Sequence, residues 1–252
     1  MRIRSLIALL LILALGASIP FAAGATEVLL PQVERQTVLY SYVGGSFGGM
    51  TATQTEAMRL KITNALLSGD SSVNLSSFRI PYTQEFVDRV AETIFYEIPE
   101  GFHVLTAGAY PNNGVIGNVV FHIKRGWDNT AYQKTMAEIQ AVAESMTADL
   151  QGLDEAEKAL LLHDRLALHC EYAYKEYLDG TVFNNDKYFD MTGPMLDGRG
   201  VCQGYAMAYM YLLRKVGIKA RYCMSEQMNH AWNIVTVGGK EYHVDVTHDD
   251  PV

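Results

Sequence analysis

Basic residues are scarce in this sequence. Its 252 residues contain 20 lysines and arginines against 28 aspartates and glutamates, which gives a formal net charge of −8, and no basic patch stands out. An acidic chain is a poor match for nucleic acid or anionic lipid, because both attract positive charge. Cysteine is also rare, and the odd count of three leaves at least one free thiol in an oxidising compartment. Cys202 is the natural free thiol, while Cys170 and Cys223 either pair or are both buried thiols.

Long apolar runs are missing except at the start of the chain. Arg2 and Arg4 precede an apolar stretch over residues 6–15, and Ala23 and Ala25 supply the small side chains of a cleavage site. This pattern predicts a secretory signal peptide over residues 1–25, with an uncleaved anchor as the alternative. We therefore expect a secreted or cell-surface, extracytoplasmic protein with no stable membrane insertion after signal removal. Cleavage changes the formal charge from −8 to −10.

Residues 26–150 are predicted to form an appended α+β region. Apolar periodicity favours helices over residues 53–67, after Thr83 and around residues 139–146, and a hairpin with strands at residues 102–110 and 115–123. His103 and His122 fall on apolar strand patterns, where a structural role is expected. Because this region offers no catalytic set of residues, we expect it to shape access to a site elsewhere.

A further helix is predicted from Asp154 to about His169. Asp154, with Glu157 three positions later, is typical of a capping box. Leucine and alanine at residues 160–162 and 166–168 make the segment apolar nearly all round, so we expect it to be buried. Within it, His163 and Asp164 are expected to have structural roles.

A cysteine follows a glycine-rich turn in the stretch Gly-Arg-Gly-Val-Cys-Gln-Gly-Tyr, residues 198–205. Cys202 opens a run whose apolar side chains, at positions 206, 209, 210 and 213, share one face of a helix. Gly198 and Gly200 permit positive φ and a close approach of a substrate backbone. A thiol in the first helical turn lies at the positive end of the macrodipole, which favours the thiolate. Cys202 is therefore a candidate nucleophile, with a small buried apolar side chain as the alternative.

Two residues further along match the needs of such a nucleophile. His230 begins the run His-Ala-Trp-Asn-Ile-Val, and Asp245 lies in an alternating strand pattern over residues 243–247, beyond the turn at residues 238–239. Strands joined by a short hairpin are neighbours, so His230 and Asp245 are expected to lie close together. Cysteine, histidine and aspartate in this order supply a nucleophile, a base and an orienting group.

Three sequence blocks together resemble the core of the bacterial transglutaminase-like superfamily. They are Gly-Val-Cys-Gln-Gly-Tyr-Ala at residues 200–206, His-Ala-Trp-Asn at 230–233 and Val-Asp-Val-Thr at 244–247, followed by Asp-Asp-Pro at 249–251. The resemblance covers about residues 154–251 and implies a papain-like arrangement with Cys202, His230 and Asp245 as catalytic residues. Two departures concern local substrate geometry. His248 stands where the family usually has tryptophan, and residues 190–195 lack the usual small and aromatic pattern.

The predicted fold class is therefore α+β. Residues 151–252 are expected to form the papain-like transglutaminase core, with the nucleophile helix packed on an antiparallel sheet, and residues 26–150 the N-terminal α+β extension. The chain stops at Val252, directly after the Asp-Asp-Pro sequence. Members of the family usually continue there with further sheet structure, so a truncated core is one expectation.

The predicted function is that of a secreted cysteine acyltransferase or hydrolase acting on peptide or protein amide bonds through a thioester. Protease, deamidase and transglutaminase activities all remain open. The Cys202 thiolate would attack the carbonyl, His230 would protonate the departing nitrogen, and Asp245 would fix the histidine tautomer. The backbone N–H of Cys202 is one expected oxyanion donor, and the second donor is unassigned, with Gln203 a weaker candidate. No cofactor or metal is expected, and the partner is a peptide or protein substrate.

Two other classes of function are alternatives for this sequence. His243, Asp245, His248, Asp249 and Asp250 are dense in ligand types, which would suit a metal-dependent hydrolase, although no established ligand spacing such as His-Glu-x-x-His is present. A catalytically inactive binding module is the other alternative, because transglutaminase-like folds also serve as scaffolds.

Overall fold

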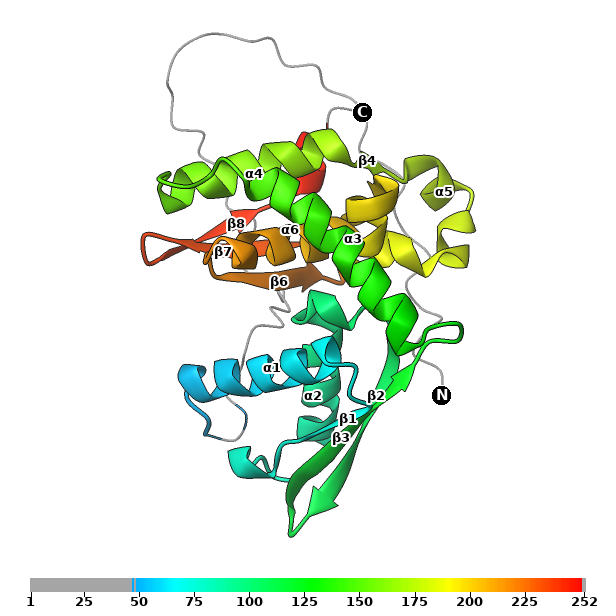
Figure 1. Ribbon diagram of the computed structural model, residues 1–252, viewed down its shortest axis with the longest axis vertical. Coiled ribbons are helices and arrows are strands. Elements are labelled where there is room, and N and C mark those ends of the chain that lie inside the picture. The colour runs from blue at the N-terminus through cyan, green and yellow to red at the C-terminus, as the bar shows by residue number, and fades with distance from the viewer. Residues whose placement is uncertain (1–46, 48, 251–252) are drawn as a thin grey trace, which may run out of the picture.

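The computed structural model describes residue 47 and residues 49–250, which form two lobes (Figure 1). The signal peptide predicted over residues 1–25 lies outside the described residues. Within the described range, none of the helices combines the length and the apolar character needed to cross a membrane. Each lobe contains a three-stranded antiparallel sheet, and the C-terminal lobe has a further two-stranded pair.

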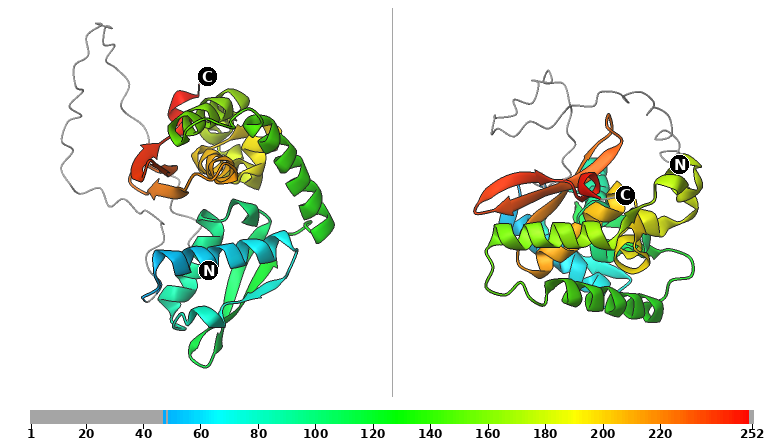
Figure 2. Two further views of the ribbon diagram at one scale, coloured as in Figure 1. Left: turned by 60° about the vertical axis from the view of Figure 1, so that its left-hand side comes forward. Right: turned by 90° about the horizontal axis from the view of Figure 1, so that it is seen from above.

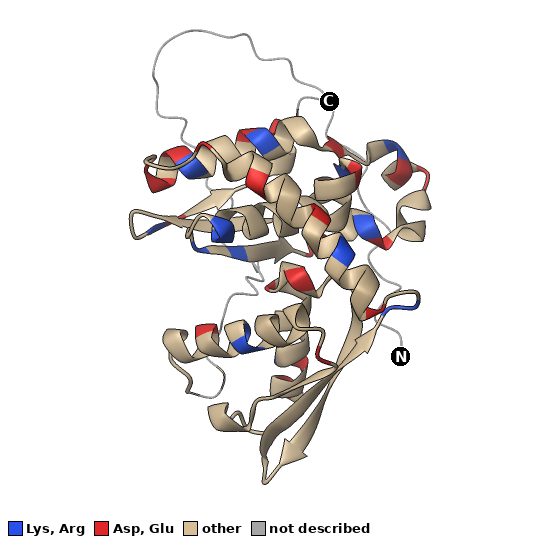
Figure 3. Cartoon of the chain, viewed as in Figure 1, with Lys and Arg blue, Asp and Glu red and all other residues tan. Residues whose placement is uncertain are grey.

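The N-terminal lobe packs two helices against its sheet. Thr51 and Gln54 form a capping box at the start of α1, and the Thr83 side chain caps α2. The predicted helices and hairpin are present, and β2 and β3 carry no charged side chain (Figure 3). The elements are α1 (Ala52–Leu67), β1 (Ser72–Asn74), α2 (Gln84–Tyr96), β2 (Val104–Asn112) and β3 (Val115–Ile123), with the strand order β1-β3-β2. The apolar core of this lobe includes Met58, Ile62, Ile94, Ile116 and Val119.

The C-terminal lobe surrounds one central helix. Its helices are α3 (Asn129–Thr147), α4 (Glu155–His169), α5 (Tyr174–Leu178) and α6 (Cys202–Lys215). Its strands are β4 (Glu171–Tyr172), β5 (Arg199–Gly200), β6 (Ala220–Ser225), β7 (His230–Val237) and β8 (Lys240–Val244). The sheet β6-β7-β8 packs on α6, while α3 and α4 lie against other sides of that helix. This is the predicted α+β arrangement of a nucleophile helix on an antiparallel sheet.

Helix α6 is more deeply buried than its predicted single apolar face requires. Every residue from Gly204 to Leu213 is buried, because the sheet and the two helices enclose it. Polar groups that enter this interior are paired. The Tyr209 hydroxyl donates to the carbonyl of Ala159 at 2.8 Å, and the Asn233 amide donates to the carbonyl of Ala206 at 3.0 Å. Such pairing offsets the cost of removing these groups from water.

The predicted burial of α4 is wrong in part. Asp154 and Glu157 form the predicted capping box, and Leu162 and Leu166 are buried. Leu160 and Leu168, however, are 62% and 78% exposed. The helix lies on the outside of the lobe with one face on the core, so leucines on the opposite face meet solvent (Figure 2).

Helix α3 belongs by its packing to the C-terminal lobe. It runs along the side of the molecule from the end of β3 towards α4 (Figure 2). Its buried side chains Tyr132, Met136 and Ile139 share one apolar cluster with Leu162 and Tyr209. The apolar core of the C-terminal lobe therefore includes α3, and it also includes Phe102 ahead of β2; the domain division at residue 150 stays a prediction.

The two histidines of the hairpin region differ in their surroundings. His103 is buried, with its ring 4.0 Å from that of Tyr132. Burial lowers its pKa to about 4, helped by the charge of Lys124, so His103 is neutral at physiological pH. His122 lies exposed on β3.

A polar and aromatic seam joins the lobes. The Arg214 guanidinium, near the end of α6, donates to the carbonyl of Glu97 at 2.5 Å and to that of Ala220 at 3.0 Å. Burial lowers the pKa of Arg214 to about 10, so the side chain stays charged at neutral pH. Tyr96 of α2 stacks on Tyr222 of β6, with ring centroids 5.2 Å apart.

Candidate functional site

Cys202 is the first residue of α6, and the backbone on either side of it is closely packed. Strand β5 pairs in parallel with β4, so Tyr172 lies opposite Gly200. A Cβ atom on Gly204 would come within 2.5 Å of the Tyr188 carbonyl oxygen, so only glycine fits there without displacing backbone. The helix has no side-chain cap at Val201. Its first N–H groups and its positive dipole end therefore lie next to the thiol.

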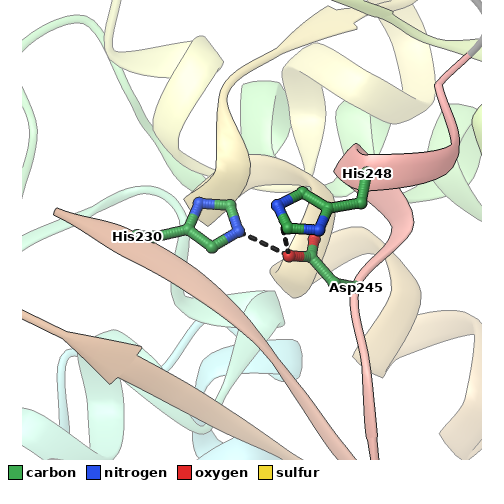
Figure 4. Close-up of side chains that lie close together, drawn as sticks. All are labelled: His230, Asp245 and His248. Carbon is green, nitrogen blue, oxygen red and sulfur yellow. Dashed lines mark hydrogen bonds and ion pairs between the residues drawn. The ribbon is translucent and has the colours of Figure 1, made fainter. Parts of the chain in front are cut away.

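His230 and Asp245 lie side by side across the β7–β8 pair. His230 begins β7, and Asp245 follows β8 directly instead of continuing the predicted strand. The two side chains meet through His230 Nε2 and Asp245 Oδ2, which are 2.5 Å apart (Figure 4). The other oxygen, Oδ1, accepts from the Thr247 N–H at 3.1 Å and from its hydroxyl at 2.7 Å. Thr247 therefore fixes the carboxylate with Oδ2 directed at His230.

The electrostatics of this pair favour the charged forms. Burial opposes charge on His230, but hydrogen bonds to Asp245 and to the Cys202 thiol outweigh it and raise the His230 pKa to about 10. Burial likewise opposes charge on Asp245, and the hydrogen bonds from His230 and Thr247 overcome it, so the Asp245 pKa is lowered. At neutral pH the site therefore holds an imidazolium beside the Asp245 carboxylate and the Cys202 sulfur. The three side chains singled out in the sequence come together in one place.

Tyr172 is a fourth member of the site that the sequence did not reveal. Its phenol lies close enough to Cys202 for the two groups to interact electrostatically. Burial raises the Tyr172 pKa, so the phenol keeps its proton. The ring stacks on Tyr205 with centroids 6.2 Å apart, and the backbone N–H of Tyr172 donates to Asp250 Oδ2 at 2.9 Å. The aromatic richness of residues 172–189 was a signal here, but it did not single out one tyrosine.

The His230 ring lies between two other rings. Trp232 stacks on it with centroids 5.8 Å apart, as expected for a side chain that packs against the histidine. His248 stacks on it as well, with centroids 5.4 Å apart and an interplanar angle of 14°. Trp232 is 8% exposed, whereas the His248 side chain is 71% exposed. One wall of the histidine is therefore the protein interior, and the other is a solvent-facing imidazole.

The five ligand-type residues at the C-terminal end do not converge as one set. His243 Nδ1 accepts from the Trp232 indole at 2.7 Å. Asp249 pairs with His163 Nε2 at 3.2 Å, which supports the structural role expected for that histidine. Asp250 is held by the Tyr205 hydroxyl and the Tyr172 N–H. In residues 47 and 49–250, the grouping that could hold a metal ion consists of His230, Asp245 and His248.

The other two cysteines are unpaired buried thiols. Cys170 is 3% exposed and Cys223 is 1% exposed, and neither forms a disulfide. Burial raises the Cys170 pKa to about 12 and also raises that of Cys223. Cys202 is half-buried and more accessible than either.

Comparison with known proteins finds one family model that matches part of the chain. Residues 140–246 match the model of the transglutaminase-like superfamily. A crystal structure described as a TGase is 15% identical, with a TM-score of 0.40 over 57% of this chain and 44% of its own. A candidate protease from Parabacteroides distasonis is 11% identical, with a TM-score of 0.31 over 55% of this chain and 35% of its own. The chain thus spans less than half the length of either structure. No curated protein gives a significant match.

Proposed function

We propose that the protein is a cysteine acyltransferase or hydrolase built on a transglutaminase-like core, which the family-model match over residues 140–246 supports. Its substrates are amide bonds of peptides or proteins, and its intermediate is a thioester on Cys202. The observation that carries the proposal is the hydrogen bond between His230 and Asp245, together with the electrostatic interaction of His230 with Cys202.

The proposed first step forms the thioester. The Cys202 thiolate attacks the amide carbonyl carbon, a C–S bond forms, and the carbonyl electron pair moves to oxygen. The tetrahedral intermediate then collapses, the C–N bond breaks, and the His230 imidazolium gives its proton to the departing nitrogen. Since Nε2 of His230 is held by Asp245, Nδ1 is the ring atom left to face the thiol and the leaving group. Asp245 stays ionised throughout and stabilises the imidazolium.

The second step releases the acyl group. Neutral His230 accepts a proton from water or from an amine, whose oxygen or nitrogen attacks the thioester carbonyl and displaces the thiolate. Attack by water completes hydrolysis or deamidation, and attack by a primary amine completes cross-linking.

Two donors are proposed for the developing oxyanion. The backbone N–H of Cys202 is the first, because it belongs to the uncapped first turn of α6. The Tyr172 hydroxyl is the second, because it lies beside Cys202 and because its phenol stays protonated. A substrate oxygen at this place would accept one hydrogen bond from each group.

The deciding experiment uses a peptide library incubated with and without a primary amine and analysed by mass spectrometry. Cleavage, a gain of one mass unit, and amine incorporation each identify a different activity. Cys202→Ala should abolish whichever is found while leaving the circular dichroism spectrum unchanged, since alanine is only slightly smaller. Cys223→Ala, which removes a buried free thiol, is the matched control and should retain activity. Turnover that is retained in Cys202→Ala and is lost only when a chelator removes metal would contradict the proposal. Peptide binding by the unmodified protein without turnover would favour a binding module.

We also propose that the protein acts outside the cytoplasm after removal of residues 1–25. Arg2, Arg4 and the apolar run after them support this placement. N-terminal sequencing of the exported product should find Thr26 as its first residue, and a retained N-terminus would contradict it.

A further inference from the structure

The Asp245 carboxylate is directed at two imidazoles. Thr247 holds Oδ1, so Oδ2 is the oxygen that faces His230 and His248. His230 Nε2 lies 2.5 Å from it and His248 Nε2 lies 3.6 Å from it (Figure 4). One ligand atom from each of the three side chains lies within 4.8 Å of the others. Two imidazole nitrogens and a carboxylate oxygen thus converge on one small volume.

This donor set fits zinc. Zinc binds histidine nitrogen and carboxylate oxygen at about 2.0–2.2 Å, which places tetrahedral ligands roughly 3.4 Å apart. The distance from His248 to Asp245 is already close to that value, and the distance from His230 to Asp245 must open by about 1 Å. Because the two imidazole rings are nearly parallel, His248 must turn out of its stack on His230 to direct its nitrogen at the ion, which its 71% exposed side chain has room to do. Solvent on its side leaves room for a fourth ligand.

We propose that His230, Asp245 and His248 form an inhibitory site for a divalent transition metal of the zinc class. The inhibitory consequence rests on the function proposed above, whereas the binding itself does not. The ion takes the place of the proton on His230 Nε2, between the ring and Asp245. An imidazole bound to metal through Nε2 carries its remaining proton on Nδ1, so it has no lone pair left for a proton from thiol, water or amine. Metal binding therefore stops the proton transfers that the cysteine chemistry needs.

His248 decides whether the site exists. Without it, the ion would have only one histidine and one carboxylate, which is one ligand short of the three found in open zinc sites. Because His248 also stacks on His230, its removal alters packing as well as ligation. His248→Phe keeps a stacking ring and removes the ligand nitrogen, so it separates these two roles.

Binding is tested on the full chain carrying Cys202→Ala, since the thiol itself is a zinc ligand. Zinc is titrated by calorimetry, and Co²⁺ is added to report tetrahedral coordination through its visible absorption. We expect one ion per chain, with affinity reduced at least about tenfold by either His248→Ala or His248→Phe. His243→Ala is the matched control, because His243 lies on the adjacent strand and is paired with Trp232. Binding that is absent, or that is unchanged in both His248 variants, would overturn the site.

Inhibition is tested on the chain with Cys202 intact. Zinc should slow turnover and a chelator should restore it, with His248→Phe at least about tenfold less sensitive to zinc. Equal sensitivity of the two proteins would refute the inhibitory role. If the chain shows no turnover at all, the proposed function fails, but the Co²⁺ titration still decides whether the site binds metal.

Discussion

Replacing Asp245 with asparagine is the most informative change at this site. The Oδ1 atom of asparagine can still accept from Thr247, as the carboxylate oxygen does at 3.1 Å and 2.7 Å. The amide nitrogen then faces His230 Nε2, where the carboxylate Oδ2 accepted a hydrogen bond at 2.5 Å. A donor now meets a donor, so His230 loses its charged partner and is released to move its proton to Nδ1.

The size of the effect follows from the hydrogen bond that is lost. A hydrogen bond to a charged group contributes about 1.5–3 kcal/mol, and one pKa unit corresponds to about 1.4 kcal/mol. The His230 pKa should therefore fall from about 10 to between about 8 and 9. The same energy corresponds to a loss of about ten- to two-hundredfold in kcat/KM. This is smaller than the loss of about 10⁴ in a serine triad, because a thiol depends less on the orienting group.

NMR titration of ¹³C-labelled histidine measures the pKa directly, with His230→Ala to assign the signal among the seven histidines. Asp249→Asn, in the same turn, is the control and should leave the His230 titration unchanged. Because the folded pKa of His230 is raised, its stabilising contribution is complete below about pH 6.5 and is lost as pH rises towards 10. Asp245→Asn should flatten that part of the stability profile. Titration of His230 near 6.5 in the unmodified protein would refute this reasoning, as would an unaltered pKa in the variant.

Three further outcomes are expected. Brief iodoacetamide treatment at about pH 6 should label Cys202 before Cys170 and Cys223, because burial both hides those two thiols and raises their pKa. His230→Ala should move the onset of Cys202 labelling to higher pH. Mass spectrometry that finds all three cysteines labelled equally would contradict this prediction. Tyr172→Phe should lower kcat by about a hundredfold with little change in KM, as for loss of one oxyanion donor, and an unchanged kcat would leave the tyrosine a packing residue. Gly204→Ala should destabilise the fold by about 1–3 kcal/mol in urea unfolding, since its Cβ would meet the Tyr188 carbonyl, and an unshifted midpoint would show that this contact relaxes freely.

The sequence predicted the residues whose role follows from local pattern. Cys202 after a glycine turn, and His230 and Asp245 on either side of a hairpin, need only neighbouring elements to meet, and the fold class followed from the same blocks. Tyr172 reaches the site through a two-residue pairing of β4 with β5. A strand that short has no periodicity, so nothing in the sequence connected this tyrosine with a cysteine thirty positions later.

Side-chain direction was a second limit of prediction. A helix rich in leucine on all sides reads as buried, but composition does not say which faces have neighbours, and Leu160 and Leu168 of α4 have none that cover them. For the N-terminal region, the sequence likewise did not show which core a helix packs against. The periodicity of α3 predicted a helix, but gave no sign that Ile139 packs with the later core.

The seam at Arg214 has a consequence for how the molecule comes apart. Its guanidinium is hydrogen-bonded to the C-terminal end of α2 in the N-terminal lobe and to β6, and Arg214 lies on the same helix that begins with Cys202. Detaching one lobe would leave the Arg214 cation without one of its hydrogen-bond acceptors, so unfolding of either lobe destabilises the other. The whole described structure should therefore denature as one cooperative unit, with Arg214→Met separating a single calorimetric peak into two.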